Sequence, residues 1–553
     1  MTAGSPLAPA APPFAPPADR RSALDPAHVG DIEGALATLP AFDTGPRRTS
    51  RRRLVTMLAV LGPGVVVMVA SNDAGSFSVF AEAGQNHGLT LLWVLLILGP
   101  ALYVTQEMVA RLGAVTGAGH ARLTLERFGR LWCGFSLVDL LALNLLVIVT
   151  EFIGVALALG YFGIGRAISV PVAAVALVAV SSGGSFRRWE RAMWVMVAGD
   201  LLLVPLVLVL HHSGATPALL GSAHAAGATG GMVLLLVALI GATIAPWQLF
   251  FQQSTVVDKR ITPRWLGYER ADTAIGAVLF VLGAGAVLIL SAWALGASPL
   301  HGHFDNVGTV LAGVSRHLGA GAGAVFAIAL LNASLLGAAA VSLSGAYAIS
   351  EVRGVKHSLH RRFFDARGFH GSVAAIVVVG AGIVLIPGLR LGPVTTLVQA
   401  LTGVLLPPTL IIVLILCNDE QLLGPQRNGP RLNLIAAGVI ALIVGLSTLL
   451  TLRTTFPDLR LGAASAITVA IVLAAGVPVA WSCRGGLFHR AAATSSGEPL
   501  TPWQRRTWSA PALELVPAMP RTRPRTLALA VARGYVLVML VLLVIKLAGV
   551  PFG

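Results

Sequence analysis

The chain has 553 residues, of which 56% are hydrophobic and 11% are charged, and its net charge is +15. Soluble domains carry about 25% charged residues. A chain of this size has more apolar surface than a soluble core can bury, which excludes a soluble enzyme and a disordered protein and indicates a polytopic membrane protein. The three cysteines, Cys133, Cys417 and Cys483, are too widely spaced for a disulfide framework or a thiolate metal cluster.

The chain begins with a segment that is not expected to cross a membrane. Residues 1–53 are rich in Pro, Ala and Arg, so we expect a mostly disordered tail that ends in a group of arginines. Thirteen apolar runs then follow, most of them long enough to span the hydrocarbon as helices: 54–82, 88–112, 132–160, 167–181, 192–210, 231–257, 271–296, 319–350, 372–386, 394–417, 432–452, 461–482 and 527–549.

The positive residues predict an orientation. If the N-terminus is cytoplasmic and the spans alternate, 32 of the 39 Lys and Arg residues fall on the inner side and 5 on the outer side. Cytoplasmic loops carry an excess of Lys and Arg. We therefore expect a multi-pass protein of the cell (plasma) membrane with a cytoplasmic N-terminus. The dominance of Arg over Lys is typical of a GC-rich bacterial genome.

Acidic residues lie within the apolar runs, whereas no Lys or Arg is expected deep inside the first twelve. Charges inside a membrane usually face a cavity or a partner. For most of these acids we favour a carboxyl that is protonated or hydrogen-bonded to a neighbouring helix and has no role in a site. These four acids are Glu107, Asp139, Asp200 and Asp272.

Asp73 stands in a different context. Small polar residues and a glycine interrupt the apolar run over residues 70–76, and a second interruption with Pro246 follows five runs later, over residues 241–248. Proline removes a helical hydrogen bond, and irregular backbone at membrane depth is tolerated where it lines a cavity or meets protein. Paired broken helices indicate an inverted-repeat transporter with a site near the midplane. Two ordinary kinks are the alternative interpretation.

Several motifs over residues 54–417 match those of one known family. They are Gly62-Pro63-Gly64, Asp73-Ala74-Gly75-Ser76, Gln106 with Ala110-Arg111-Leu112-Gly113, Val115-Thr116-Gly117, Glu151-Phe152-Ile153-Gly154, and Gln399 eight residues before Pro407. With these motifs the chain resembles the NRAMP family of divalent-metal transporters, which has Asp-Pro-Gly-Asn where this chain has Asp73-Ala74-Gly75-Ser76 and Glu-Val-Ile-Gly where it has Glu151-Phe152-Ile153-Gly154.

The resemblance implies an all-α membrane protein with a LeuT-like inverted 5+5 repeat, in which helices 1 and 6 are broken, plus two to three extra C-terminal spans. The ten-span core would cover 54–417, with repeats at 54–210 and 231–417. We expect spans 11 and 12 in 418–482, a cytoplasmic segment in 483–525 and a last span in 526–553.

The resemblance also implies a metal site. Its expected ligands come from the two breaks and span 10, and further residues would line it. The metal ligands would be Asp73, Ser76, Gln399 and the carbonyls of Ala70 and Ala242; Gly75, Ala245, Trp247 and Gln248 would line the site; Glu151 and Gln252 would hold protons or support the ligands.

The departures from the family concern selectivity and coupling. The family reads Met-Pro-His at the second break, where this chain has Ala245-Pro246-Trp247. Loss of a thioether leaves oxygen ligands, which suit Mg²⁺. This pattern resembles the NRAMP-related magnesium transporters. The family's histidines are replaced by Trp247 and Gln252, and an acid by Ile148, so we expect weak or no proton coupling.

We therefore expect a transporter that takes up Mg²⁺ and Mn²⁺ by alternating access, not an enzyme. The expected partners are divalent metal ions and the lipid bilayer; no nucleic-acid motif and no cofactor are indicated. The alternatives are a proton-coupled Mn²⁺/Fe²⁺ importer of the same family, and a sodium-coupled organic-solute carrier of the same fold. A channel and a metal-sensing receptor are more distant alternatives.

Overall fold

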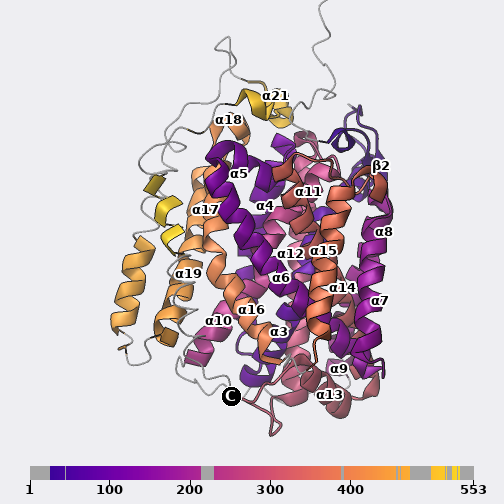
Figure 1. Ribbon diagram of the computed structural model, residues 1–553, viewed down its shortest axis with the longest axis vertical. Coiled ribbons are helices and arrows are strands. Elements are labelled where there is room, and N and C mark those ends of the chain that lie inside the picture. Colours follow the sequence, from indigo (N-terminus) through magenta and orange to yellow (C-terminus); the bar gives the residue numbers. More distant parts are fainter. Residues whose placement is uncertain are drawn as a thin grey trace, which may run out of the picture.

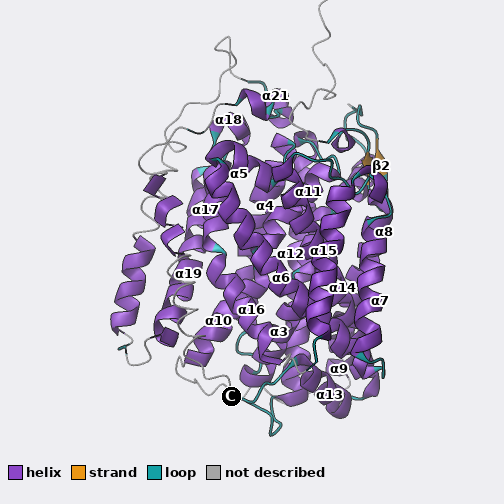
Figure 2. Cartoon of the chain, viewed as in Figure 1, coloured by secondary structure: helices purple, strands orange, loops and turns teal. Residues whose placement is uncertain are grey.

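A computed structural model describes most of the chain as a bundle of helices (Figures 1 and 2). The longer described stretches are 25–43, 45–212, 230–387, 392–455, 462–473 and 500–516, and the remaining described residues are 459–460, 519, 526–527, 529–531 and 533–535. Of the candidate last span, 527–549, most lies outside the described residues. The structure below refers to the described stretches alone.

The helices of the bundle follow the predicted apolar runs. The long helices are α4 (Leu92–Thr116), α6 (Arg130–Tyr161), α7 (Arg166–Ser181), α8 (Phe186–Asp200) with α9 (Leu203–His212), α12 (Leu266–Leu295), α14 (Ala320–Arg353), α15 (Arg367–Leu385), α16 (Gly392–Leu405) with α17 (Pro407–Cys417), and α19 (Pro430–Thr455). By length and composition, nine described helices can cross a membrane, or up to ten when one bent pair is counted. Within 461–482, residues 462–473 form a shorter apolar helix.

Two of the predicted spans are broken, as the sequence indicates. The first consists of α2 (Pro63–Ala70) and α3 (Ala74–His87), preceded by α1 (Ser50–Val60), which is bent 48° from α2. The second consists of α10 (Gly230–Thr243) and α11 (Pro246–Asp258). Every residue of α2 is buried, and so is 89% of the most apolar 18-residue stretch of the α10–α11 span. Helices that are apolar all round belong in a core.

The remaining elements lie at the two ends of the bundle. One end carries α5 (His120–Phe128), α18 (Glu420–Leu423), α21 (Pro502–Thr507) and a short hairpin of β1 (Ile32–Glu33) and β2 (Thr38–Leu39); we call it the hairpin end (Figure 1). The opposite end carries α9 and α13 (Val307–Leu318). The described stretches also hold five single 3-10 turns: Pro26–His28, Pro263–Trp265, Phe363–Asp365, Gly424–Gln426 and Leu513–Leu515.

The prediction of a mostly disordered tail over 1–53 does not hold for residues 25–43. The strands pair in antiparallel register, Ile32 with Leu39 and Glu33 with Thr38, and both apolar residues are buried. Asp25 caps the turn that follows it by accepting the N–H of Ala27. The composition of the tail concealed this segment because, besides the contacts within it, many of its partners lie on the distant bundle.

Glycines let the broken helices pack closely on α12. A Cβ on Gly84 of α3 would lie 2.1 Å from the carbonyl oxygen of Leu288, and one on Gly64 of α2 would lie 2.6 Å from the backbone nitrogen of Thr273. Such contacts bring backbone against backbone, so no side-chain movement can relieve an added methyl group. The close packing of α2 and α3 on α12 therefore depends on these glycines.

We predict that Gly84→Ala destabilises the fold by about 1–3 kcal/mol, the usual cost of overpacking a core. A thermal unfolding series of the purified protein in detergent would measure this. Gly134→Ala in α6 is the matched control, because nothing lies within 4 Å of its added Cβ. The control should be neutral or stabilising by about 0.5–1 kcal/mol. Equal unfolding temperatures for Gly84→Ala and the unmodified chain would contradict the close contact.

Candidate functional site: two broken helices and their oxygen atoms

The first break separates α2 from α3 at Ser71-Asn72-Asp73. Asp73 is the N-cap of α3, and its Oδ1 accepts the backbone N–H of Ser76 at 2.8 Å. Such residues compete with helical hydrogen bonds and favour caps. The carboxylate therefore lies at the positive end of the α3 dipole, which stabilises negative charge. Asp73 is 2% exposed, so this position is closed to solvent.

Glu151 of α6 keeps the first break open. In a continuous helix the N–H of Ala74 would bond to the carbonyl of Ala70, four residues earlier. Instead this N–H donates to Oε2 of Glu151 at 3.0 Å. The Ala74 N–H, which a continuous helix would direct at the Ala70 carbonyl, is thus bonded to Glu151. Glu151 is fully buried, and its Oε1 has no hydrogen-bond partner among the described residues.

Pro246 has the same effect at the second break. Because proline has no N–H, it cannot donate to the carbonyl four residues earlier, which is that of Ala242. The Ala242 carbonyl instead accepts the hydroxyl of Ser76 at 2.9 Å. The two breaks therefore meet directly, through one side chain of α3 and one freed carbonyl of α10. Ser76 and Ala242 are each 1% exposed.

Gln399 of α16 completes the group. Its Nε2 donates to Oδ1 of Asp73 at 3.3 Å. Two glycines make room for it: a Cβ on Gly75 would lie 2.2 Å from the Gln399 Nε2, and one on Gly241 would lie 1.9 Å from the Gln399 carbonyl oxygen. The predicted residues Asp73, Ser76, Ala242 and Gln399 are thus joined by hydrogen bonds, with Ala70 and Gly75 beside them in sequence. We call this set the Asp73 group.

The residues after the second break have other partners. Ala245 is the N-cap of α11 and is 2% exposed, and the carbonyl of Trp247 accepts the hydroxyl of Ser344 at 3.0 Å. Gln248 accepts from Nε2 of Gln106 at 3.2 Å, and Gln252 donates to Thr273 at 3.0 Å. The described hydrogen bonds of Gln248 and Gln252 therefore tie α11 to α4 and α12 and do not join the Asp73 group.

Two of the remaining intramembrane acids, Asp272 and Asp200, have structural partners. Asp272 accepts the N–H groups of Gly62, Gly64 and Val65 at 2.7–3.2 Å, which caps the beginning of α2. Asp200 accepts from Asn72 at 3.3 Å. Both acids are thus hydrogen-bonded to a neighbouring helix, as we favoured from the sequence.

Glu107 requires a correction. The expectation that the spans hold acids without buried cations is wrong here, because Arg111 is 1% exposed and donates to Glu107 at 3.0 Å. Arg270 also donates to Glu107, at 2.8 Å. The spacing of four residues between Glu107 and Arg111 is the signal that could have predicted this pair.

Two glycines also shape the site: Gly154 belongs to the family motif quoted above, whereas no sequence motif marks Gly337. A Cβ on Gly337 of α14 would lie 2.8 Å from both the Cβ of Asp73 and Oε2 of Glu151. A Cβ on Gly154 would lie 2.3 Å from the hydroxyl of Ser334 and 2.4 Å from the Cβ of Ala74. Gly337 lies on α14, whereas Asp73 and Glu151 belong to other helices, so no local sequence pattern indicates that the three residues meet.

The donor set limits what the Asp73 group can bind. Among the described residues, no three His, Cys, Asp or Glu side chains are placed to hold a metal ion together. The group offers one carboxylate, a hydroxyl, an amide and backbone carbonyls, and no sulfur. Hard cations prefer such oxygen ligands.

Comparisons with known proteins agree with this geometry. The family model described as "Natural resistance-associated macrophage protein-like" matches residues 64–453. The divalent metal cation transporter MntH of Ralstonia nicotianae is 27% identical over 420 residues, which cover 70% of this chain and 89% of that protein. MntH of Deinococcus radiodurans is 28% identical over 325 residues, covering 54% and 70%.

A solved structure supports the fold. The Eremococcus coleocola manganese transporter superposes with a TM-score of 0.59 at 18% identity, covering 79% of this chain and 96% of that one. The predicted all-α fold, an inverted 5+5 repeat with broken helices 1 and 6, is thereby confirmed. Since the family model covers residues 64–453, which include both breaks and Gln399, the chain belongs to the natural resistance-associated macrophage protein-like (NRAMP) family.

Proposed function

We propose that the chain transports divalent metal cations, Mg²⁺ and Mn²⁺, across the cell membrane by alternating access. The observation that carries this proposal is the Asp73 group: a buried carboxylate that meets neutral oxygens from two broken helices. The relatives described as divalent metal cation transporters support the class of cargo. They also support a transporter over an enzyme.

The preference for Mg²⁺ rests on Ala245. The resemblance places a methionine ligand at this position in the family, and the alanine leaves the Asp73 group without sulfur. Mg²⁺ keeps several of its waters and takes oxygen ligands in octahedral geometry. Ser76 and the carbonyls of Ala70 and Ala242 can hold those waters. Gln399 would turn its amide so that the oxygen faces the cation, since the amide orientation follows its partners.

Transport is proposed to run inward with weak or no proton coupling. The Gln252 amide stands where the family has a histidine, and amides do not titrate. Two positive charges that cross a potential of 100 mV gain about 4.6 kcal/mol, at ~2.3 kcal/mol per charge. Uptake therefore needs no second driving ion. The distribution of Lys and Arg supports a cytoplasmic N-terminus, and we propose that the hairpin end faces the cytoplasm with it.

The alternative favoured by a specific observation is a Mn²⁺ importer coupled to protons. The solved relative is called a manganese transporter, and Glu151 is a buried acid next to the Asp73 group, with one oxygen that has no partner in the described part of the chain. The two functions differ in cargo preference and in proton movement. A sodium-coupled carrier of organic solutes would instead respond to competition by amines or amino acids and not by metals.

We predict that Asp73→Asn lowers Mg²⁺ and Mn²⁺ uptake into proteoliposomes by about 100-fold or more, because it removes the anionic ligand. The fold should persist, since an asparagine can still cap α3. Asp139→Asn is the matched control: it is a buried acid of α6, twelve residues and about 18 Å along the helix from Glu151. Retained uptake in Asp73→Asn would sink the proposed site.

We predict that Ala245→Met shifts the preference from Mg²⁺ toward Mn²⁺ by about tenfold, or ~1.4 kcal/mol. Competition between the two metals in the uptake assay would measure the ratio. Leu249→Met, at a buried position of α11 one turn later, adds the same thioether without placing it at the break. An unchanged ratio in Ala245→Met would count against the argument from the lost sulfur.

We predict that Mg²⁺ entry into liposomes holding a pH-sensitive dye leaves the internal pH unchanged. The reason is that the histidine positions of the family are occupied here by Trp247 and Gln252. The experiment uses an imposed potential and the Asp73→Asn chain as the background. Acidification in proportion to metal entry would establish proton coupling and favour the Mn²⁺ importer.

A further inference from the structure

The segment before α1 is bound to parts of the chain that lie more than 300 residues away. The Asp25 carboxylate accepts the backbone N–H of His357 at 2.9 Å, and Arg361 donates to it from Nε at 2.8 Å and from Nη2 at 2.5 Å. His357 and Arg361 belong to the loop between α14 and α15. Burial opposes ionisation of Asp25, but the hydrogen bonds from Arg361 and Ala27, with the neighbouring positive charges, hold its pKa well below the usual range.

His28 extends this contact to the end of α11. It is 3% exposed, and its Nε2 lies 2.9 Å from the His357 carbonyl oxygen and 3.6 Å from Oδ1 of Asp258, the last residue of α11. The His28 and His357 rings pack edge to face with centroids 5.1 Å apart. Burial lowers the pKa of His28, although Asp258 and Asp25 oppose this shift. A neutral ring can donate one N–H to the His357 carbonyl.

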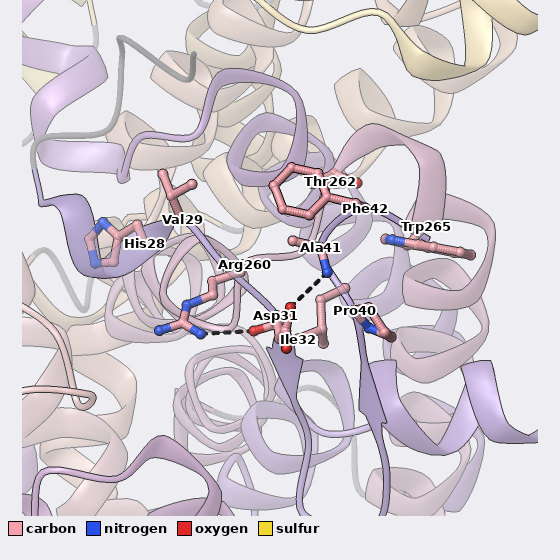
Figure 3. Close-up of a pocket in the computed structure, with 11 residues that line it drawn as sticks. His28, Val29, Asp31, Ile32, Pro40, Ala41, Phe42, Arg260, Thr262 and Trp265 are labelled. Atoms are coloured by element: carbon pink, nitrogen blue, oxygen red, sulfur yellow. Dashed lines mark hydrogen bonds between the residues drawn. The ribbon is translucent and has the colours of Figure 1, made fainter. Parts of the chain in front are cut away.

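The hairpin adds a second set of contacts. The N–H of Ala35 donates to Glu190 of α8 at 2.5 Å, and Arg191 donates to the Ala35 carbonyl at 3.1 Å. Arg260, two residues after α11, donates to the carbonyls of Ala27 and Asp31, both at 2.9 Å. Figure 3 shows Arg260 reaching Asp31, beside a pocket of about 120 Å³ that the segment forms with Thr262 and Trp265.

The contacts of this segment connect helices that have to separate when the hairpin end opens. The half-helices α2 and α11 both lie between a break and the hairpin end. The chain enters α2 from the hairpin and α1 and reaches the first break at its end, whereas α11 begins at the second break and ends at Asp258 beside His28. For the Asp73 group to open toward this end, α2 and α11 must separate from α8 and α14. Residues 25–35 hold the end of α11 through Arg260, α8 through Glu190, and the α14–α15 loop through Arg361.

We propose that residues 25–35 form a latch that keeps the hairpin end closed and must detach from Arg361 and Glu190 before the Asp73 group can open to that side. This inference rests on the alternating access proposed above. The surface formed by α8, the end of α11 and the α14–α15 loop is thus occupied by a segment of the chain itself. The latch stabilises the closed state by the amount by which it binds that state more tightly than the open one, as a ligand does.

A covalent latch provides the sharpest test. In a full chain whose three cysteines are replaced by serine, Asp25→Cys and Arg361→Cys would be joined by a short, reducible, bifunctional thiol reagent. We expect Mn²⁺ uptake into proteoliposomes to fall by about tenfold or more and to return on reduction. The control joins Asp43→Cys to Arg47→Cys, an ion pair within the segment that follows the latch. Unchanged uptake in the linked Asp25–Arg361 protein would overturn the latch.

A second measurement separates failure of the latch from failure of the proposed function. Spin labels at the exposed positions Arg53 of α1 and Arg188 of α8 would report the opening of the hairpin end without any cargo. Asp25→Asn should add a longer distance to the distribution, raising its share about fivefold or more, and Asp43→Asn should not. The exchange Asp25→Arg with Arg361→Asp should restore the short distance. Identical distributions in Asp25→Asn and the unmodified chain would refute the latch, even if neither metal is transported.

Discussion

The whole site depends on two backbone carbonyls that lose their helical donors in the middle of the bundle. Pro246 has no N–H to offer Ala242, and Glu151 takes the N–H that Ala74 would have offered Ala70. In a membrane interior each polar backbone group needs a partner within the protein. The breaks can exist because Ser76 and Glu151 supply such partners from other helices. Under the proposed function, the Ser76 hydroxyl and the Ala242 carbonyl that meet at the breaks are also atoms that a cation would use.

The buried acids fall into two groups: those whose hydrogen bonds are structural, and Asp73, which belongs to the candidate site. Asp272 caps α2, Asp200 holds the side chain of Asn72, and Glu107 is neutralised by Arg111. Asp73 caps α3 through one oxygen and belongs to the group of oxygens from three helices. A site with one carboxylate and neutral donors suits a cation that keeps part of its hydration shell. Gly337 packs against both Asp73 and Glu151, and its lack of a side chain lets these two acids approach each other.

The hairpin end connects the site to the rest of the chain. The Lys259 ammonium donates to Glu190 at 2.6 Å and to the carbonyls of Val60 and Leu61, so the corner between α1 and α2 is tied to α8 and α11. Asp258 binds Tyr347, Ser358 and the N–H of Leu359, which ties α11 to α14 and its loop. The proposed latch lies over these bonds, so movement of α2 or α11 would disturb both layers together.

The sequence by itself determined the class of protein, the apolar runs and the two breaks, whereas the candidate residues of the site came from its resemblance to the NRAMP family. It could do so because membrane spans, prolines and clusters of small polar residues act locally, within one helix. The tertiary structure alone decided which side chains meet. Ser76 reaches Ala242 across 166 residues and Gln399 reaches Asp73 across 326. It also decided that residues 25–43 are ordered and that Glu107 is paired, because those partners come from distant segments whose packing no local pattern records.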